Sequence, residues 1–350
     1  CIRDRYNRLM TPTSKPHTPD PNQSSWRQAV AGYQHADWRR SVWQVINTLV
    51  PFFVLWYLMY RSLEVSYWLT LALSILTAGF LMRVFIIFHD CGHGSFFRSR
   101  RANDAVGILT GILTLTPYYQ WRHDHAVHHA TAGDLDERGV GDVWTLTVQE
   151  YREASPQKRM AYRLFRYPLV MLGFGPFFIF VISQRFPRKG AAKRERHSVY
   201  WTNLALLGIL ALMGLAIGFK AFVLVHLPIM LIAGAIGVWM FYVQHQFEGV
   251  YWERHDNWDY ASAALKGSSF YQLPKVFQWF TGNIGFHHIH HLSPRIPNYY
   301  LEGCHRENPV FQEVKPITLL SSLKSLRYRL WDEDGRRLVG FGFLKTVAVE

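Results

Sequence analysis

Long apolar runs alternate with strongly polar blocks along this chain of 350 residues. Four runs of 20 or more residues are predominantly apolar, at 41–60, 65–88, 199–218 and 221–243. A helix of about 20 residues crosses the hydrocarbon core of a bilayer, which is roughly 30 Å thick. The pattern therefore predicts an all-α integral membrane protein with four spanning helices and a long loop, 89–198, between the second and the third.

Composition and charge add an orientation to this picture. The mean hydropathy is only −0.04 although 49% of the residues are hydrophobic, so apolar and polar residues are segregated. The formal net charge is +13, and lysines and arginines crowd both sides of the run 167–182, in KRMAYRLFR and RFPRKGAAKRER. Cytoplasmic loops carry such an excess. We therefore expect the loop 89–198 and both chain ends on the cytoplasmic side of the membrane.

Three regions follow from this division. Residues 1–40 form an N-terminal cytoplasmic segment, expected to be partly disordered because 1–34 is rich in Pro, Ser, Thr and charge. Residues 41–245 form the membrane domain, and 246–350 a C-terminal cytoplasmic cap. No cleavable signal peptide is recognised. The three cysteines, Cys1, Cys91 and Cys304, are odd in number and unrelated in spacing, so no disulfide framework is expected.

Most of the 17 histidines fall in three short clusters: HDCGH from His89, HDHAVHH from His123 and HHIHH from His287. Residues three or four apart share one face of a helix, so each cluster can present its imidazoles together. The convergent set is His89, His93, His125, His128, His129, His287, His290 and His291. Eight imidazoles exceed the four ligands of a tetrahedral zinc site, which predicts a histidine-rich site for two metal ions.

The number of spans between the histidine clusters decides whether two shorter apolar runs, 105–119 and 167–182, can cross the membrane. If the three clusters build one site, an even number of spans must separate His93 from His287. The runs 199–218 and 221–243 already give two. The run 167–182 also contains two prolines and two glycines. We therefore expect both short runs to be interfacial or re-entrant.

The ends of the spans place three further residues. The run 65–88 would form about 36 Å of helix, longer than the membrane core, so its end should project beyond the bilayer with Arg83 near the lipid headgroups. His245 follows the last span at the level of the clusters and is predicted to be the ninth ligand. His226, in the middle of that span, is interpreted as a packing residue.

The clusters closely resemble a known family. HDCGH, HAVHH and GNIGFHHIHHLSPRIPNY are similar to the three histidine boxes of integral-membrane fatty-acid desaturases, in the acyl-lipid branch that includes the Δ12 (ω6) and bacterial Δ5 enzymes. GDVWTLTVQEY, FYVQHQFEGVYWE and the tail SLRYRLWDE extend the similarity to the Bacillus-type Δ5 acyl-lipid desaturases. The resemblance covers roughly residues 35 to 335.

The resemblance implies two non-haem iron ions that use O2 as co-substrate to introduce a cis double bond into the acyl chain of a phospholipid or glycolipid. The nine histidines above would be the iron ligands, with no other catalytic side chain, whereas His123 and His288 lie outside the matching positions. The chain has no haem, nucleotide or iron–sulfur motif of its own. An external electron donor such as ferredoxin is therefore implied, and its acidic surface would suit a basic protein.

Two sets of supporting residues are expected around the irons. A histidine ligand usually donates its second N–H to an acceptor, and the nearest carboxylates in the sequence are those of Asp90, Asp124, Asp142 and Asp259. An acyl chain has no polar group near its reacting carbons, so a narrow apolar tunnel must position it. Candidate lining residues are Phe85, Gly234, Gly237, Trp239 and Phe241.

Three other functions compete with this interpretation. A di-iron hydroxylase of a lipid, carotenoid or alkane would use the same site, and only the extended similarity favours desaturation. A ferritin-like protein would need two Glu-x-x-His pairs, but only Glu302 with His305 has this spacing. A metal transporter would carry ionisable residues within its spans, which are nearly free of them. No nucleic-acid partner is expected.

Overall fold

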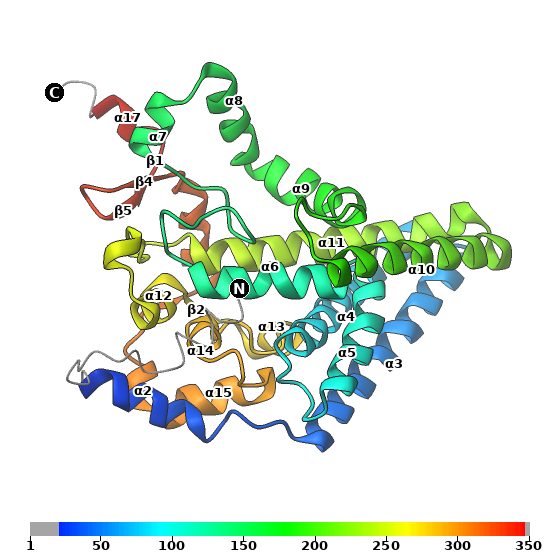
Figure 1. The fold of residues 1–350 in the computed structure, drawn as a ribbon. Helices are drawn as coiled ribbons and strands as arrows, with labels where there is room; N and C mark the ends of the chain where they lie inside the picture. Colours follow the sequence, from blue (N-terminus) through cyan, green and yellow to red (C-terminus); the bar gives the residue numbers. More distant parts are fainter. Residues whose placement is uncertain (1–20, 347–350) are drawn as a thin grey trace.

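The structure is a computed structural model that describes residues 21–346. Four helices are long and apolar enough to cross a membrane: α3 (Trp38–Ser62), α4 (Tyr67–His93), α10 (Lys193–Ile217) and α11 (Phe219–His245). They confirm the four predicted spans. In Figure 1 they occupy one side of the molecule, and the shorter helices and strands of the cap occupy the other.

The ends of these helices follow from local sequence. α4 is continuous from Tyr67 to His93 and stops at Gly94, whose φ of 74° is the left-handed conformation that glycine adopts without strain. α10 begins at Lys193, earlier than predicted, so its first turns are strongly basic. A single residue, Gly218 with φ of 85°, separates α10 from α11. The helix α4 therefore carries His89 and His93 at its very end, as predicted.

Two helices cross the ends of the spans. α5 (Arg100–Leu113) packs against α4, and α6 (Tyr118–Thr131) follows it after a short turn. They meet where Gly107 leaves room for the ring of Tyr118, whose hydroxyl donates a hydrogen bond of 2.7 Å to the Cys91 carbonyl. This contact fixes the start of α6 against the last turns of α4 (Figure 1).

The apolar run 167–182 forms a broken element. α8 (Pro156–Phe165) bends by 68° into a series of short pieces that ends at Arg185. The pieces are the π-helical turns η1 (Val170–Phe174) and η2 (Phe178–Ile182), α9 (Gly175–Phe177) between them, and the 3₁₀ turn η3 (Ser183–Arg185). π-helical turns are rare and are found mostly at functional sites. The element packs along α11 through Met171, which shares a core cluster with Tyr242 and Val243.

The cap combines short helices with small sheets. Its helices are α2 (Pro21–Ala31), α7 (Val148–Glu153), α12 (Tyr260–Gly267), α13 (Lys275–Phe280), α14 (His287–Leu292), α15 (Asn298–Glu307), α16 (Leu319–Ser322) and α17 (Phe343–Thr346). One sheet has the order β1–β4–β5, from β1 (Leu146–Thr147), β4 (Leu330–Asp332) and β5 (Arg337–Val339); β2 (Phe270–Tyr271) pairs in parallel with β3 (Pro316–Ile317). These strands were not predicted, and β1 shows that the loop 89–198 contributes to the cap.

Two expectations about single regions are corrected. Residues 21–31, predicted to be disordered, form α2, in which Trp26 and Val30 are buried; residues 1–20, including Cys1, lie outside the described residues. Arg83 does not reach the headgroups. It is buried, stacks 4.0 Å from the ring centre of Trp279, and donates hydrogen bonds to Thr48 Oγ1 and the Trp279 carbonyl. Sequence position alone could not reveal that α3 and the cap supply these acceptors.

The contact between α5 and α6 generates a stability prediction. A Cβ at Gly107 would overlap the buried ring of Tyr118, so Gly107→Ala should lower the free energy of unfolding by about 1–3 kcal/mol. Gly208→Ala in α10 is the matched control, because no atom lies within 4 Å of its added Cβ. It should be neutral or slightly stabilising. Thermal unfolding of both variants in detergent measures the difference, and equal melting temperatures would contradict this packing.

Candidate metal centre

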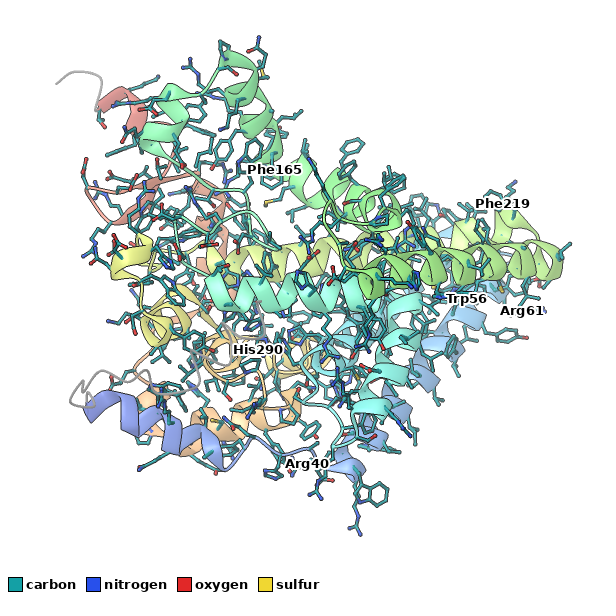
Figure 2. The ribbon with its side chains drawn as sticks, viewed as in Figure 1. Arg40, Trp56, Arg61, Phe165, Phe219 and His290 are labelled. Carbon is teal, nitrogen blue, oxygen red and sulfur yellow. The ribbon has the colours of Figure 1, made fainter. Side chains whose placement is uncertain are left out.

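All nine predicted ligand residues meet in one place. His89 and His93 come from α4, His245 from α11, and the others from two short helices: His125, His128 and His129 from α6, and His287, His290 and His291 from α14. Figure 2 shows His290 beside α6 and far from Phe219 and Arg61, which mark the opposite ends of α11 and α3. The cluster therefore lies at one end of the spans.

The nine residues form two adjoining groups. In the first, His89, His93, His125, His129 and His290 each offer a ring nitrogen, and these atoms lie within 4.8 Å of one another. His128, His245 and His291 form the second group under the same limit. His287 adjoins the second group, because its Nε2 lies 3.0 Å from Nε2 of His245. Two groups of this composition fit two metal ions.

The arrangement of the imidazole nitrogens also supports metal binding. Nε2 of His129 lies 3.2 Å from Nε2 of His125 and 3.0 Å from Nε2 of His290. One proton can satisfy only one such pair, so the remaining lone pairs face one another in a buried site. Burial, and then neighbouring imidazoles, hold the pKa of His129 and His290 well below the usual value. A buried set of neutral imidazoles with converging lone pairs is the donor set that transition metals prefer.

Two of the four candidate carboxylates orient a histidine. Asp90 Oδ1 lies 3.0 Å from Nδ1 of His89, and Asp142 Oδ1 lies 2.7 Å from Nδ1 of His128. Asp90 is held in turn by Asn298, whose backbone N and side-chain Nδ2 donate to Asp90 Oδ2 at 2.7 and 2.8 Å. Acceptors of this kind fix the ring and its tautomer, which leaves Nε2 free to bind a metal.

The other two carboxylates have different roles. Asp124 pairs with Arg188, with 2.8 Å between Oδ1 and Nε. Asp259 caps the start of α12 by accepting a hydrogen bond of 2.9 Å from the Ser262 backbone N–H. In the sequence these four aspartates were equivalent candidates, since each lies near a histidine motif or its flanking segment. Only the fold decides which carboxylates reach an imidazole.

An apolar cavity of about 340 Å³ leads from this cluster into the membrane domain. It touches His89, His125 and His287 at one end, and it runs between α4, α11 and the broken element 166–185. Four of the five predicted lining residues line it: Phe85, Gly234, Gly237 and Phe241. Trp239 does not, because its indole N–H points toward the Tyr271 hydroxyl in the cap.

Two residues of the site were missed by sequence reasoning. Trp121 lines the cavity and stacks on His125, with 4.3 Å between ring centres and 22° between planes. Its position four residues before His125, on the same helix face, was a usable signal. Asn298, which holds Asp90, left no such signal, because the two residues are 208 positions apart.

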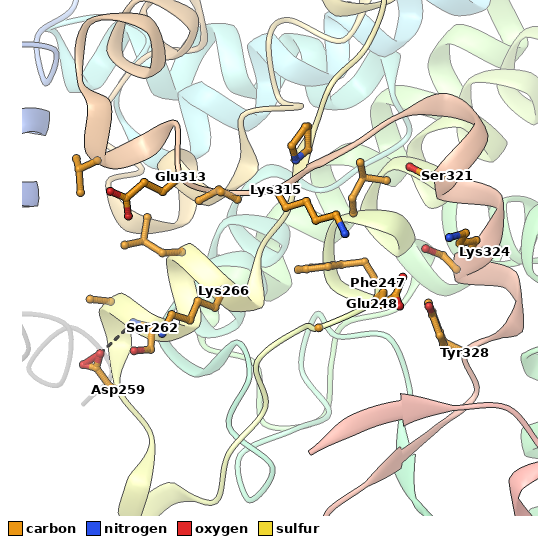
Figure 3. Close-up of a pocket in the computed structure, with 18 of the residues that line it drawn as sticks. Phe247, Glu248, Asp259, Ser262, Lys266, Glu313, Lys315, Ser321, Lys324 and Tyr328 are labelled. Carbon is orange, nitrogen blue, oxygen red and sulfur yellow. Dashed lines mark hydrogen bonds between the residues drawn. The ribbon is translucent and has the colours of Figure 1, made fainter. Parts of the chain in front are cut away.

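A second, larger cavity of about 1120 Å³ lies in the cap (Figure 3). Lys266, Lys315 and Lys324 line it together with Glu248 and Glu313, so its surface is polar and mixed in charge. Phe247, which also lines it, is two residues beyond His245. None of the nine histidines lines this cavity, so it is separate from the cluster.

The sequence of this chain is similar to those of known proteins. The family model described as fatty acid desaturase matches residues 66–317. The chain is 52% identical over 327 residues to a fatty acid desaturase of Bacillus subtilis, covering 93% of both chains. It is 29% identical over 285 residues to the sn-1 oleoyl-lipid 12-desaturase of Synechocystis, covering 76% of this chain and 77% of the relative.

A plant relative extends the comparison. The chain is 28% identical over 241 residues to an endoplasmic-reticulum omega-3 fatty acid desaturase of Vigna radiata, covering 62% of this chain and 59% of the relative. The segment matched by the family model includes α4, α10, α11 and all nine histidines of the cluster. With a family model that covers most of its length and a relative more than half identical to it, the chain belongs to the fatty acid desaturase family.

Proposed function

We propose that this chain is an acyl-lipid desaturase that uses O2 and two non-haem irons, held by the nine histidines, to introduce a cis double bond. The observation that carries the proposal is the apolar cavity, which ends at the histidine cluster and is lined almost throughout by carbon. A pair of irons, when bound, would supply the oxidising power that unactivated methylene groups require, and that chemistry belongs to the cofactor. The protein supplies binding and position.

Position is the main task of the protein, because a methylene chain offers no group to hydrogen-bond. Along α11 the cavity extends from the histidine end to Met230, 15 residues before His245, which corresponds to about 22 Å of helix. Phe85, Trp121 and Phe241 surround the end beside the histidines. An acyl chain inserted to the far end would hold a fixed carbon pair at the cluster, so we assign regioselectivity, whether Δ5 or Δ12 (ω6), to the depth of this cavity.

Access from the membrane is assigned to the broken element. Phe165, Val170, Met171 and Gly175 line the cavity. Leu169 and Phe174, which lie between these residues in the sequence, are 70% and 73% exposed. The apolar outer face suits contact with lipid, and the π-helical turns break the regular hydrogen bonding that would make the element rigid. A membrane lipid can thus bring its acyl chain in sideways, which supports a phospholipid or glycolipid as substrate.

The same arrangement bears on topology and on the electron donor. Because His89 and His290 lie side by side, with 4.5 Å between ring centres, an even number of spans separates them, and the broken element returns to the side from which it came. The basic segments around it support a cytoplasmic location for that side, in the inner membrane of a bacterial cell. There an acidic carrier such as ferredoxin would reach the protein, and Lys266, Lys315 and Lys324 around the cavity of Figure 3 offer it basic groups.

The central test is product formation by variants of one helix. In a host without polyunsaturated lipids, the protein should form new double bonds in membrane lipids only when O2 is present. His125→Ala should abolish the product and reduce bound iron, because His125 belongs to the first histidine group. His123→Ala, on the same helix and paired with Glu195 instead, should retain both. Mass spectrometry of the lipids would overturn desaturation if it found hydroxylated chains.

The carboxylates give a second prediction. Asp142→Ala removes the acceptor that orients His128 and should weaken iron binding by roughly 10- to 100-fold. Asp124→Ala removes a carboxylate that engages Arg188, so its effect on iron should be much smaller. Iron content after dialysis against a chelator compares the two variants. Equal losses would show that these carboxylates act on the fold rather than on the histidine.

The depth of the cavity gives a third prediction. A Cβ at Gly234 would lie 2.7 Å from Cβ of Pro176 and 3.4 Å from the Phe180 ring, so Gly234→Val should fill the far part of the cavity. The ratio of products from shorter acyl chains to products from longer ones should rise several-fold, with iron content unchanged. Gly214→Val in α10 is the control, because nothing lies within 4 Å of its Cβ. An unaltered product profile in Gly234→Val would remove this segment from the determination of chain length.

A further inference from the structure

A third cavity, of about 600 Å³, lies between α5, the first turn of α6 and the first turns of α10. Its walls combine two kinds of side chain. Ile108 and Ile112 from α5 and Trp201 from α10 are apolar, whereas Lys193, Arg194 and His197 from α10 are basic. The basic residues all lie in the first two turns of α10, and Trp201 lies further along it, so the cavity is polar at one end and apolar at the other.

The position of this cavity relative to the bilayer follows from α10, which is one of the four spans. Below the basic turns its outer face is apolar: Trp201 is 67% exposed and Leu204 57%. Leu109 of α5 is likewise 64% exposed. Such surfaces are stable in contact with lipid rather than water. The basic end of the cavity therefore lies at the level of the lipid headgroups, and its apolar end lies at the level of the acyl chains.

The charges around the cavity are not balanced. Asp104 pairs with Arg194 at 3.2 Å, but it also pairs with Arg122 at 3.1 Å. Glu195 is directed toward Arg188 and His123, with 3.6 Å to each. Among the described residues, Lys193 and His197 have no ion pair or side-chain hydrogen bond. The rim of the cavity is thus positive and has donors to spare.

The start of α10 adds a backbone contribution. Its N-cap residue, Ala192, has no side-chain acceptor for the N–H groups of the first turn, and the Glu195 carboxylate in that turn accepts a hydrogen bond of 3.0 Å from the Ala192 N–H only. A helix N-terminus carries a partial positive charge, and together with adjacent cations it attracts phosphate groups. The guanidinium of Arg194 is already held, with its central carbon 3.8 Å from the ring centre of Tyr119. Because the fold already holds this side chain in place, less conformational entropy is lost when a phosphate binds to it.

We propose that this cavity binds an anionic phospholipid, with its phosphate at Lys193, Arg194 and His197 and one acyl chain along Ile108, Ile112 and Trp201. A free anion would use only the basic end, and a neutral lipid would gain mainly from the apolar end. Basic pockets between helices at a membrane surface select acidic lipids for this reason. The site is distinct from the proposed substrate cavity, because the two have no lining residue in common.

The bound lipid would act on the fold through α6. The Tyr119 backbone N–H donates a hydrogen bond of 3.0 Å to Ser198 Oγ of α10, and the neighbouring Tyr118 hydroxyl donates to the Cys91 carbonyl of α4. A lipid that fills the space between α5 and α10 supports both contacts. A ligand that binds only the folded state stabilises it in proportion to its occupancy. Anionic lipid should therefore raise the melting temperature of the protein.

The test is lipid binding by the full chain in detergent. Native mass spectrometry should show dioleoyl phosphatidylglycerol bound several-fold more tightly than dioleoyl phosphatidylcholine, and the first should raise the melting temperature more. Lys193→Gln combined with His197→Gln should remove most of this preference. The control, Lys158→Gln with Lys189→Gln, removes two exposed lysines outside the cavity and should keep the preference, which separates a built site from general surface charge.

Three results would overturn the proposal. One is equal binding of the two lipids by the unmodified chain. Another is an unchanged preference in the Lys193 and His197 double variant while its iron content and fold remain intact. The third is an equal rise in melting temperature with glycerol phosphate, which would identify an anion site without a lipid. None of these measurements requires turnover, so the outcome does not depend on whether the chain desaturates lipids.

Discussion

The structure depends on a requirement that nine imidazoles meet in a buried place at the end of apolar helices. Seven of them are less than a tenth exposed, and their Nε2 atoms approach one another to about hydrogen-bond distance. Uncharged nitrogens facing each other in this way are poorly satisfied without a metal. The positions of α4, α6, α11 and α14 are all set by this convergence, and the cap is built so that α14 can reach the other three.

The second constraint is the scarcity of polar surface in the apolar cavity between α4, α11 and the broken element. A membrane protein that is to hold a hydrocarbon chain needs a cavity that neither water nor the surrounding helices fill. Here the broken element 166–185 provides one wall of it, with Phe180 and Pro176 against Gly234 of α11. A regular spanning helix at this position would be straight and continuous. The element instead bends by 68° between α8 and η1 and then packs along α11 through Met171.

Single residues show where sequence reasoning worked. Spacing placed His89, His93 and the two HxxHH sets correctly, because residues three and four apart share a helix face whatever the rest of the fold does. It failed for Arg83, which was expected at the membrane surface but is enclosed by Thr48 and Trp279. It was also wrong for Trp239 as a cavity residue. In both cases the partners are more than 30 residues away in sequence, and the aromatic ones, Trp279 and Tyr271, come from the cap.

The sequence by itself determined the four spans, the histidine-rich site and the family resemblance, since hydrophobic length and local spacing need no knowledge of the partners. Only the tertiary structure decided which carboxylates orient imidazoles, that the nine histidines fall into two groups, and where the cavities lie. Asp90 and Asp142 look no different from Asp124 and Asp259 along the chain. They differ because a hydrogen bond between residues distant in sequence exists only after the packing of α4, α6 and α15 has set the distance between its atoms.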